Sequence, residues 1–131
     1  MTKKIFTEIS VGELLDKISI LEIKLKNIKD KDKLKHIKKE YQILMKIKKK
    51  FKIKRSLNKY YNQLKKINTN LWNIENRIRK YEKLKAFNKN FINTARKVYF
   101  TNDKRSQVKL KINKIMNSNI IEMKSYSKYN K

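Results

Sequence analysis

The sequence of 131 residues contains no cysteine and no proline, and it has one glycine and one histidine. Without cysteine there is no disulfide, no thiolate metal site and no cysteine nucleophile. The single histidine, His36, excludes a zinc site built from histidines, and we interpret it as a surface residue beside Ile37 rather than a catalytic base. Turns in sheets depend on glycine and proline, so this composition argues against an all-β fold.

Acidic residues are also scarce, with 11 Asp and Glu against 37 Lys and Arg, which gives a net charge of +26. This charge predicts affinity for polyanions that falls steeply with salt. Only 5 of the cations are Arg, and Ile and Asn are abundant, so codon drift in an AT-rich genome explains most of the excess. The run from Lys46 to Arg55 is the candidate nucleic-acid interface, although a solvated helix end is the simpler interpretation.

Long apolar runs are missing as well. None approaches the roughly 20 residues that cross a bilayer, and the first ten residues, MTKKIFTEIS, lack the apolar segment of a secretory signal. We therefore expect no membrane span and a cytoplasmic location. The length predicts a single domain over residues 1–131.

Apolar periodicity predicts four helices, at about residues 11–28, 32–54, 57–85 and 89–116. The third is the clearest, because apolar residues recur at steps of 3 and 4 from Leu57 to Tyr81. Short connections between the helices predict an all-α, up-and-down antiparallel four-helix bundle that ends in a short irregular C-terminal tail. Long amphipathic helices also leave a homodimer or a helical scaffold as an alternative.

Polar residues at the expected helix starts support these boundaries. Ser10 and Glu13 fit a capping box, in which each side chain bonds the backbone of the other residue. The expected N-caps of the other helices are Asp32, Ser56 and Asn88.

The apolar stripe of the fourth helix is interrupted. Continuing it from Phe91 by steps of 4 and 3 places three polar residues toward the core, namely Asn102, Arg105 and Lys109. Burying an unpaired arginine costs several kcal/mol. Either the stripe rotates so that Val108 faces inward, or these charges meet acids from the other helices.

The other helices carry such acids. Glu13 and Asp16 lie one turn apart on the first helix, while Trp72, Glu75 and Arg79 share a face of the third. Three interpretations follow. The first is an ion-pair network that holds the helix register. The second is an anion site, in which arginines grip an anionic group and aromatic rings stack on the ligand. The third is a Mg²⁺ site built from Glu13, Asp16, Glu75 and Asp103.

We expect the second interpretation, with a phosphorylated sugar or a nucleotide-sugar as ligand and without a resident cofactor. Glu13 and Glu75 are the candidates for any acid-base catalysis, and turnover itself stays open. Glu75 is expected to reach Arg96, Arg105 or Lys109 from the neighbouring helix. The predicted ligand-binding residues are Asp16, Trp72, Arg79, Arg96, Tyr99, Asn102, Asp103, Arg105 and Lys109.

Four motifs, GELLDKISILEIK, LWNIENRIR, ARKVYFTNDKR and EMKSY, resemble those of a small family of bacterial and phage proteins that is catalogued as a domain of unknown function. The resemblance covers nearly the whole chain outside residues 30–60. It implies no catalytic residue, since no activity is known for the family. It does imply a link to surface-polysaccharide synthesis, because members occur beside sugar-transfer genes.

The resemblance also marks individual positions. This chain departs from the family where a second acid is expected, with Asn76 after Glu75 and Met123 after Glu122, which weakens the metal interpretation. The family positions found here are Gly12, Glu13, Asp16, Lys17, Trp72, Glu75, Arg79, Arg96, Tyr99, Asn102, Asp103, Arg105, Lys109, Glu122, Lys124 and Tyr126.

Overall fold

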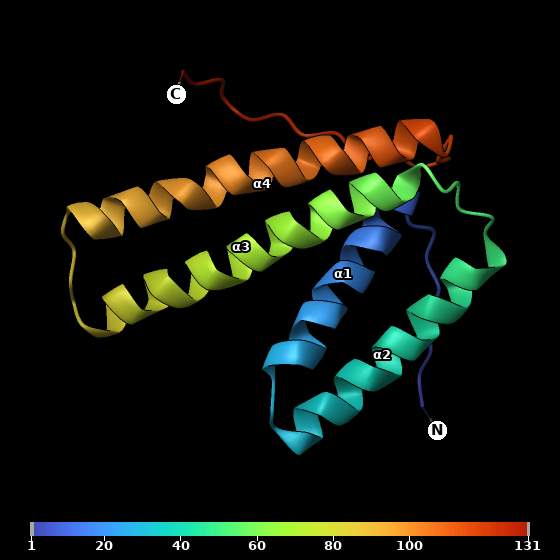
Figure 1. Ribbon diagram of the computed structural model, residues 1–131, viewed down its shortest axis with the longest axis horizontal. Coiled ribbons are helices and arrows are strands. Elements are labelled where there is room, and N and C mark those ends of the chain that lie inside the picture. Colours follow the sequence, from blue (N-terminus) through green and yellow to red (C-terminus); the bar gives the residue numbers. More distant parts are fainter. Residues whose placement is uncertain (1, 131) are drawn as a thin grey trace.

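The computed structural model describes residues 2–130, which form four α-helices and contain no strand. These helices are α1 (Val11–Asn27), α2 (Lys31–Lys50), α3 (Leu57–Lys83) and α4 (Lys89–Ile115). Successive helices run antiparallel and an irregular segment follows α4 (Figure 1). The predicted all-α fold with four helices and an irregular C-terminal segment is confirmed.

The helices are arranged as two hairpins that cross (Figure 1). The α3–α4 hairpin is the longer, and the α1–α2 hairpin meets it near one end. Helix α1 packs against α2, α3 and α4, whereas the backbone of α2 lies beside α1. The core therefore lies where α1 crosses the long hairpin, and one cluster of its buried apolar side chains consists of Leu15, Leu57, Leu64, Val108 and Ile112.

Three of the four predicted N-caps, Ser10, Ser56 and Asn88, are found at the helix starts, and the Ser56 side chain accepts no capping bond from the described residues. Ser10 accepts a hydrogen bond from the Glu13 amide at 3.1 Å, and Asn88 accepts one from the Phe91 amide at 3.2 Å. The prediction for the second helix is wrong by two residues, because Asp30 caps α2 by accepting from the Lys33 amide at 3.0 Å. Asp32 lies inside the first turn of α2, where its carboxylate favours the helix dipole.

Helix α2 also ends earlier than predicted, at Lys50 instead of residue 54, because Phe51 has an extended backbone. None of the α2 residues, all of which the structure describes, is fully buried, so little packing energy is available to hold a further turn of closely spaced lysines. The basic run Lys46–Arg55 therefore spans the helix end and the connection to α3.

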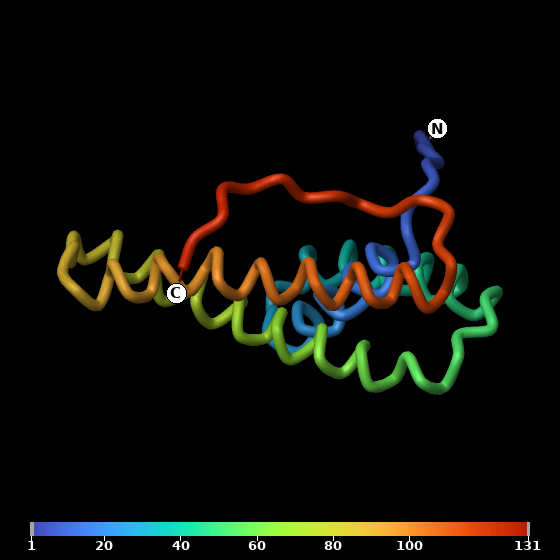
Figure 2. Tube along the Cα trace, turned by 90° about the horizontal axis from the view of Figure 1, so that it is seen from above, coloured from blue at the N-terminus to red at the C-terminus, as the bar shows by residue number. Residues whose placement is uncertain are grey.

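After α4 the chain reverses and runs back along the same helix (Figure 2). Asn117 takes a positive φ of 50°, and the Ser118 amide donates to the Asn113 carbonyl at 2.8 Å, which closes the turn. The C-terminal segment, residues 116–130, thus lies over α4. Among the described residues, no helix has the length and apolar character that crossing a membrane requires.

Candidate functional site

The polar interruption of α4 forms an ion pair across the interface with α1. The Arg105 Nε donates to the Asp16 Oδ1 at 2.9 Å, and its Nη2 donates to the Asp16 Oδ2. Asp16 is fully buried, and Val108 is buried beside the same interface. The two alternatives for α4 therefore occur together, since Val108 faces inward and Arg105 pairs with a carboxylate.

Three helices hold the Asp16 carboxylate in place. The Asn68 Nδ2 on α3 donates to the Asp16 Oδ1 at 2.9 Å and lies 2.8 Å from the Ser19 Oγ. The Ser19 hydroxyl in turn donates to the Asp16 carbonyl at 2.7 Å. The hydrogen bond from Arg105 to Asp16 raises the pKa of Arg105, and burial opposes this only in part, so the guanidinium stays charged.

The only glycine of the sequence lies where α1 and α4 touch. The Gly12 amide donates to the Asn113 Oδ1 at 2.6 Å, and a Cβ at Gly12 would lie 2.7 Å from the Lys109 carbonyl oxygen. Close backbone approach therefore places Glu13 beside Lys109. Our sequence reasoning missed Asn113, and a glycine inside a helix was the signal for this contact.

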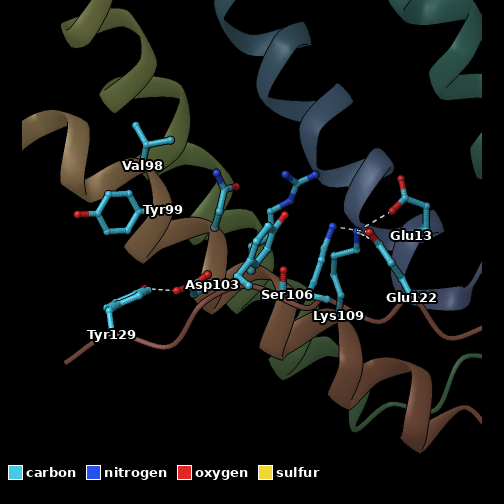
Figure 3. A pocket seen from close by; sticks show the side chains of 12 residues that line it. Glu13, Val98, Tyr99, Asp103, Ser106, Lys109, Glu122 and Tyr129 are labelled. Atoms are coloured by element: carbon cyan, nitrogen blue, oxygen red, sulfur yellow. Dashed lines mark hydrogen bonds and ion pairs between the residues drawn. The ribbon is translucent and has the colours of Figure 1, made fainter. Parts of the chain in front are cut away.

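Two lysines share one carboxylate of the C-terminal segment. The Lys109 Nζ donates to the Glu13 Oε2 at 2.6 Å and to the Glu122 Oε2 at 3.3 Å (Figure 3). The Lys124 Nζ lies 2.5 Å from the Glu122 Oε1. The bond from Lys124, and then the charge of Lys109, lower the pKa of Glu122, so this carboxylate is ionised at neutral pH.

These groups line a cleft of about 630 Å³ between α1, α4 and the C-terminal segment. At one end the Tyr129 hydroxyl donates to the Asp103 Oδ2, which raises the pKa of Tyr129 to about 12 (Figure 3). We call this cleft of about 630 Å³ the α4 cleft. Its lining residues are Glu13, Val98, Tyr99, Asn102, Asp103, Arg105, Ser106, Lys109, Glu122, Lys124, Tyr126 and Tyr129.

Six of the predicted residues line the α4 cleft, and Asp16 lies buried behind it, paired with Arg105. Ser106 and Tyr129, which also line the cleft, were not predicted from the sequence. Glu122, Lys124 and Tyr126 were marked by the family resemblance alone, because the C-terminal segment has no periodicity from which its position could be read.

A second cleft, of about 500 Å³, contains the predicted residues of α3, Trp72, Glu75 and Arg79. It shares Asn102 and Arg105 with the α4 cleft. The Arg79 guanidinium donates to the Glu75 carboxylate one turn away on the same helix, so Glu75 pairs within α3. The expectation that Glu75 reaches Arg96, Arg105 or Lys109 is therefore corrected.

Arg96, one of the predicted ligand-binding residues, lines neither the α4 cleft nor the second cleft. Its side chain is exposed, and its guanidinium carbon lies 5.4 Å from the centre of the Phe100 ring. His36 is exposed on α2, as expected for a surface residue. Within residues 2–130, no three side chains of His, Cys, Asp and Glu are grouped so that they could hold a metal ion. Of the acids in the Mg²⁺ interpretation, Glu13 and Asp103 line the α4 cleft and Glu75 lines the second cleft. Asp16 lines neither cleft, because it is buried in its pair with Arg105.

A family model described as "Family of unknown function (DUF6165)" matches residues 5–130. The chain belongs to this family. Both clefts lie within the matched residues, and so do all four helices. No curated protein and no solved structure matches the chain. The DUF6165 match agrees with the resemblance to a family of unknown function, and the function has to be argued from the α4 cleft itself.

Proposed function

We propose that the α4 cleft binds an anionic small molecule, a phosphorylated sugar or a nucleotide-sugar. The observation that carries this proposal is the Glu122 carboxylate, which lies between Lys109 and Lys124 on the cleft wall. Two ammonium groups on one carboxylate form the environment that also suits a phosphate. We infer that a ligand phosphate takes the place of Glu122 between these lysines.

The electrostatics of the cleft support an exchange of one anion for another. Arg105 stays paired with the buried Asp16, which holds its guanidinium in one position at the cleft wall. Lys109 keeps its bond to Glu13, whereas Lys124 loses its partner when Glu122 leaves. A phosphate would therefore pair with Lys124, which has lost its partner, and would share Lys109 with Glu13. The net charge of +26 on the chain supplies long-range attraction for the ligand.

The rest of the lining suits a sugar or a base. The rings of Tyr99, Tyr126 and Tyr129 offer flat apolar faces with polar tips. Asn102 and Ser106 offer neutral hydrogen-bonding groups. Because Asn102 also lines the second cleft together with Trp72, a ligand with two parts, such as a nucleotide-sugar, could extend past Arg105.

Any reaction in the α4 cleft would use Glu13 as its acid-base residue, because the other candidate, Glu75, lines the second cleft. Binding of nucleotide-sugars in the cytoplasm would fit the link to surface-polysaccharide synthesis that the family resemblance implies. We propose this setting together with the ligand class.

Titration calorimetry with uridine diphosphate glucose, glucose 1-phosphate and inorganic phosphate tests the proposal. We expect Lys109→Met to weaken binding of the phosphorylated sugars about ten-fold, because a hydrogen bond to a charged group is lost. Lys124→Met should act in the same direction. Lys104→Met is the matched control, because Lys104 is exposed on α4.

Thermal unfolding of each variant confirms that the fold is intact before the titration. Equal affinities for Lys109→Met and Lys104→Met would contradict the proposal, as would the absence of binding to all three ligands.

Separate experiments test the two alternative functions, nucleic-acid binding and a homodimer or scaffold role. Nucleic-acid binding by the Lys46–Arg55 run would appear in filter binding as tight, salt-dependent affinity for any DNA, unchanged by Arg105→Ala. A homodimer or scaffold role would appear in light scattering as a doubled mass.

A further inference from the structure

Helix α2 presents large apolar side chains to solvent. One side of α2 packs on α1, and next to that side Ile43 and Phe51, at the helix end, are 50% and 51% exposed. Ile47 lies one turn after Ile43 and is exposed as well. Apolar side chains gathered on one face, instead of scattered singly, indicate a surface that something covers.

The N-terminal segment, residues 2–9, adds to the same face. Ile5 and Phe6 are 92% and 89% exposed, which is extreme for residues of this kind. They line a groove of about 490 Å³ together with Ile43, Ile47 and Phe51. Residues 2–9 lie outside the helices and extend from the start of α1 (Figure 2). We call Ile5, Phe6, Ile43, Ile47 and Phe51 the apolar stripe.

Cations border the apolar stripe. Lys39, Lys46 and Lys50 lie four before, three after and seven after Ile43, so the helix repeat places them next to Ile43 and Ile47 on the α2 surface. All three are exposed. Further exposed cations adjoin the stripe in sequence: Lys3, Lys4, Lys52, Lys54 and Arg55.

We propose that α2 and the N-terminal segment dock on an anionic phospholipid surface. A basic amphipathic helix lies in the plane of the interface, with its apolar face among the acyl chains and its lysines at the phosphates. Here Ile5, Phe6 and Phe51 would enter the bilayer surface while the bordering lysines contact anionic headgroups. The clefts are lined by α1, α3, α4 and the C-terminal segment, so docking through α2 leaves them open.

The combination of charge and apolar surface favours an anionic bilayer over a nucleic acid or a second copy of the chain. A nucleic-acid backbone pairs with cations, and bases stack on aromatic rings such as Phe6 and Phe51, but a nucleic acid leaves the three isoleucines of the stripe in water. A second copy of the chain would cover the stripe, but it also carries a net charge of +26 and repels the first. An anionic bilayer accepts both the charges and the apolar side chains.

Co-sedimentation with lipid vesicles tests this proposal. We expect the full chain to bind vesicles of phosphatidylcholine and phosphatidylglycerol mixed in equal parts, and to bind pure phosphatidylcholine much more weakly. Substituting Ile5→Ser and Phe6→Ser together should lower the partition coefficient about ten-fold, since two apolar side chains no longer enter the bilayer. Both are almost fully exposed, so the fold should be unaffected.

The matched control for this pair is Leu84→Ser with Ile92→Ser. These residues are 64% and 56% exposed and lie at or next to the connection between α3 and α4. That connection lies far from α2 (Figure 1). The control should partition like the unmodified chain. An equal loss in both pairs would overturn the proposal, because any exposed apolar residue would then have the same effect.

A second pair of variants separates the local surface from the total charge. Lys46→Gln with Lys50→Gln should reduce binding several-fold more than Lys97→Gln with Lys104→Gln, although both pairs remove the same charge. Equal losses would overturn the proposal. Two further results would overturn the proposal. If the chain does not bind vesicles but binds DNA equally well with and without Ile5 and Phe6, the surface is a nucleic-acid interface. If the chain does not bind vesicles but forms a dimer that the Ile5 and Phe6 variant loses, the surface is an interface between two copies.

Discussion

The value of a charged residue in this protein depends on where it lies. Most of the 32 lysines are exposed, and an exposed ion pair contributes at most about 1 kcal/mol. Asp16 is fully buried, and without Arg105 its only charged partner among the described residues would be Lys109, whose Nζ lies 3.8 Å from the Asp16 Oδ2. Breaking the pair with Arg105 should therefore cost up to about 3–5 kcal/mol. The site therefore depends on a few buried or half-buried charges, while the numerous lysines act through their summed field.

Gly12 tests how tightly α1 and α4 are packed. Gly12→Ala places a Cβ 2.7 Å from the Lys109 carbonyl oxygen, a backbone atom that can move only with α4. We expect a loss of about 1–3 kcal/mol in the free energy of unfolding, measured by urea denaturation. At an unconstrained helix position the same change would stabilise by up to about 1 kcal/mol. A stabilised variant would therefore show that the two backbones do not touch.

At single residues the sequence indicated that Arg105 meets a carboxylate, but it did not indicate that Arg96 lies outside both clefts. The interruption of the apolar periodicity of α4 indicates Arg105, because an arginine that faces the core needs a charged partner. Arg96 precedes it by nine positions, about two and a half turns, which puts the two guanidinium groups on opposite sides of α4. Glu75 was misassigned because Arg79, one turn away, is a nearer partner than any residue of α4.

At the element scale, the helix caps give a matched comparison. The Ser10 side chain accepts a hydrogen bond from the Glu13 amide, whereas Ser56, at the same position before α3, accepts no capping bond from the described residues. Ser10→Ala should therefore lower the free energy of unfolding by about 1 kcal/mol, and Ser56→Ala should leave it nearly unchanged. Urea denaturation of both variants checks this. Equal losses would mean that the side-chain bond at Ser10 contributes nothing.

Helices could be predicted from the sequence, but the C-terminal segment could not. Periodic apolar residues locate all four helices, with the largest error at the end of α2. The C-terminal segment has no period, and its path depends on contacts with residues far away in the sequence. The Ser118 hydroxyl accepts from the Val11 amide at 3.2 Å, Glu122 binds Lys109, and Tyr129 donates to Asp103. Hence one wall of the α4 cleft was missing from the prediction.

At the scale of the whole molecule, local patterns did not predict how the hairpins cross. The stripes of α1, α3 and α4 would suit a bundle of four nearly parallel helices. The close approach at Gly12 and the pairing of Asp16 with Arg105 instead bring α1 onto the C-terminal half of α4. The outer part of the long hairpin is therefore free of α1 (Figure 1). This arrangement leaves room for two clefts on either side of Arg105.

We proposed that a ligand phosphate takes the place of Glu122 between its two lysines, and the Glu122→Gln variant tests this exchange. The Glu122 carboxylate is ionised at neutral pH because Lys124 and Lys109 lower its pKa, so it competes with an anionic ligand. Titration calorimetry with glucose 1-phosphate should show about three- to ten-fold tighter binding to Glu122→Gln than to the unmodified chain. Unchanged or weaker binding would contradict the account.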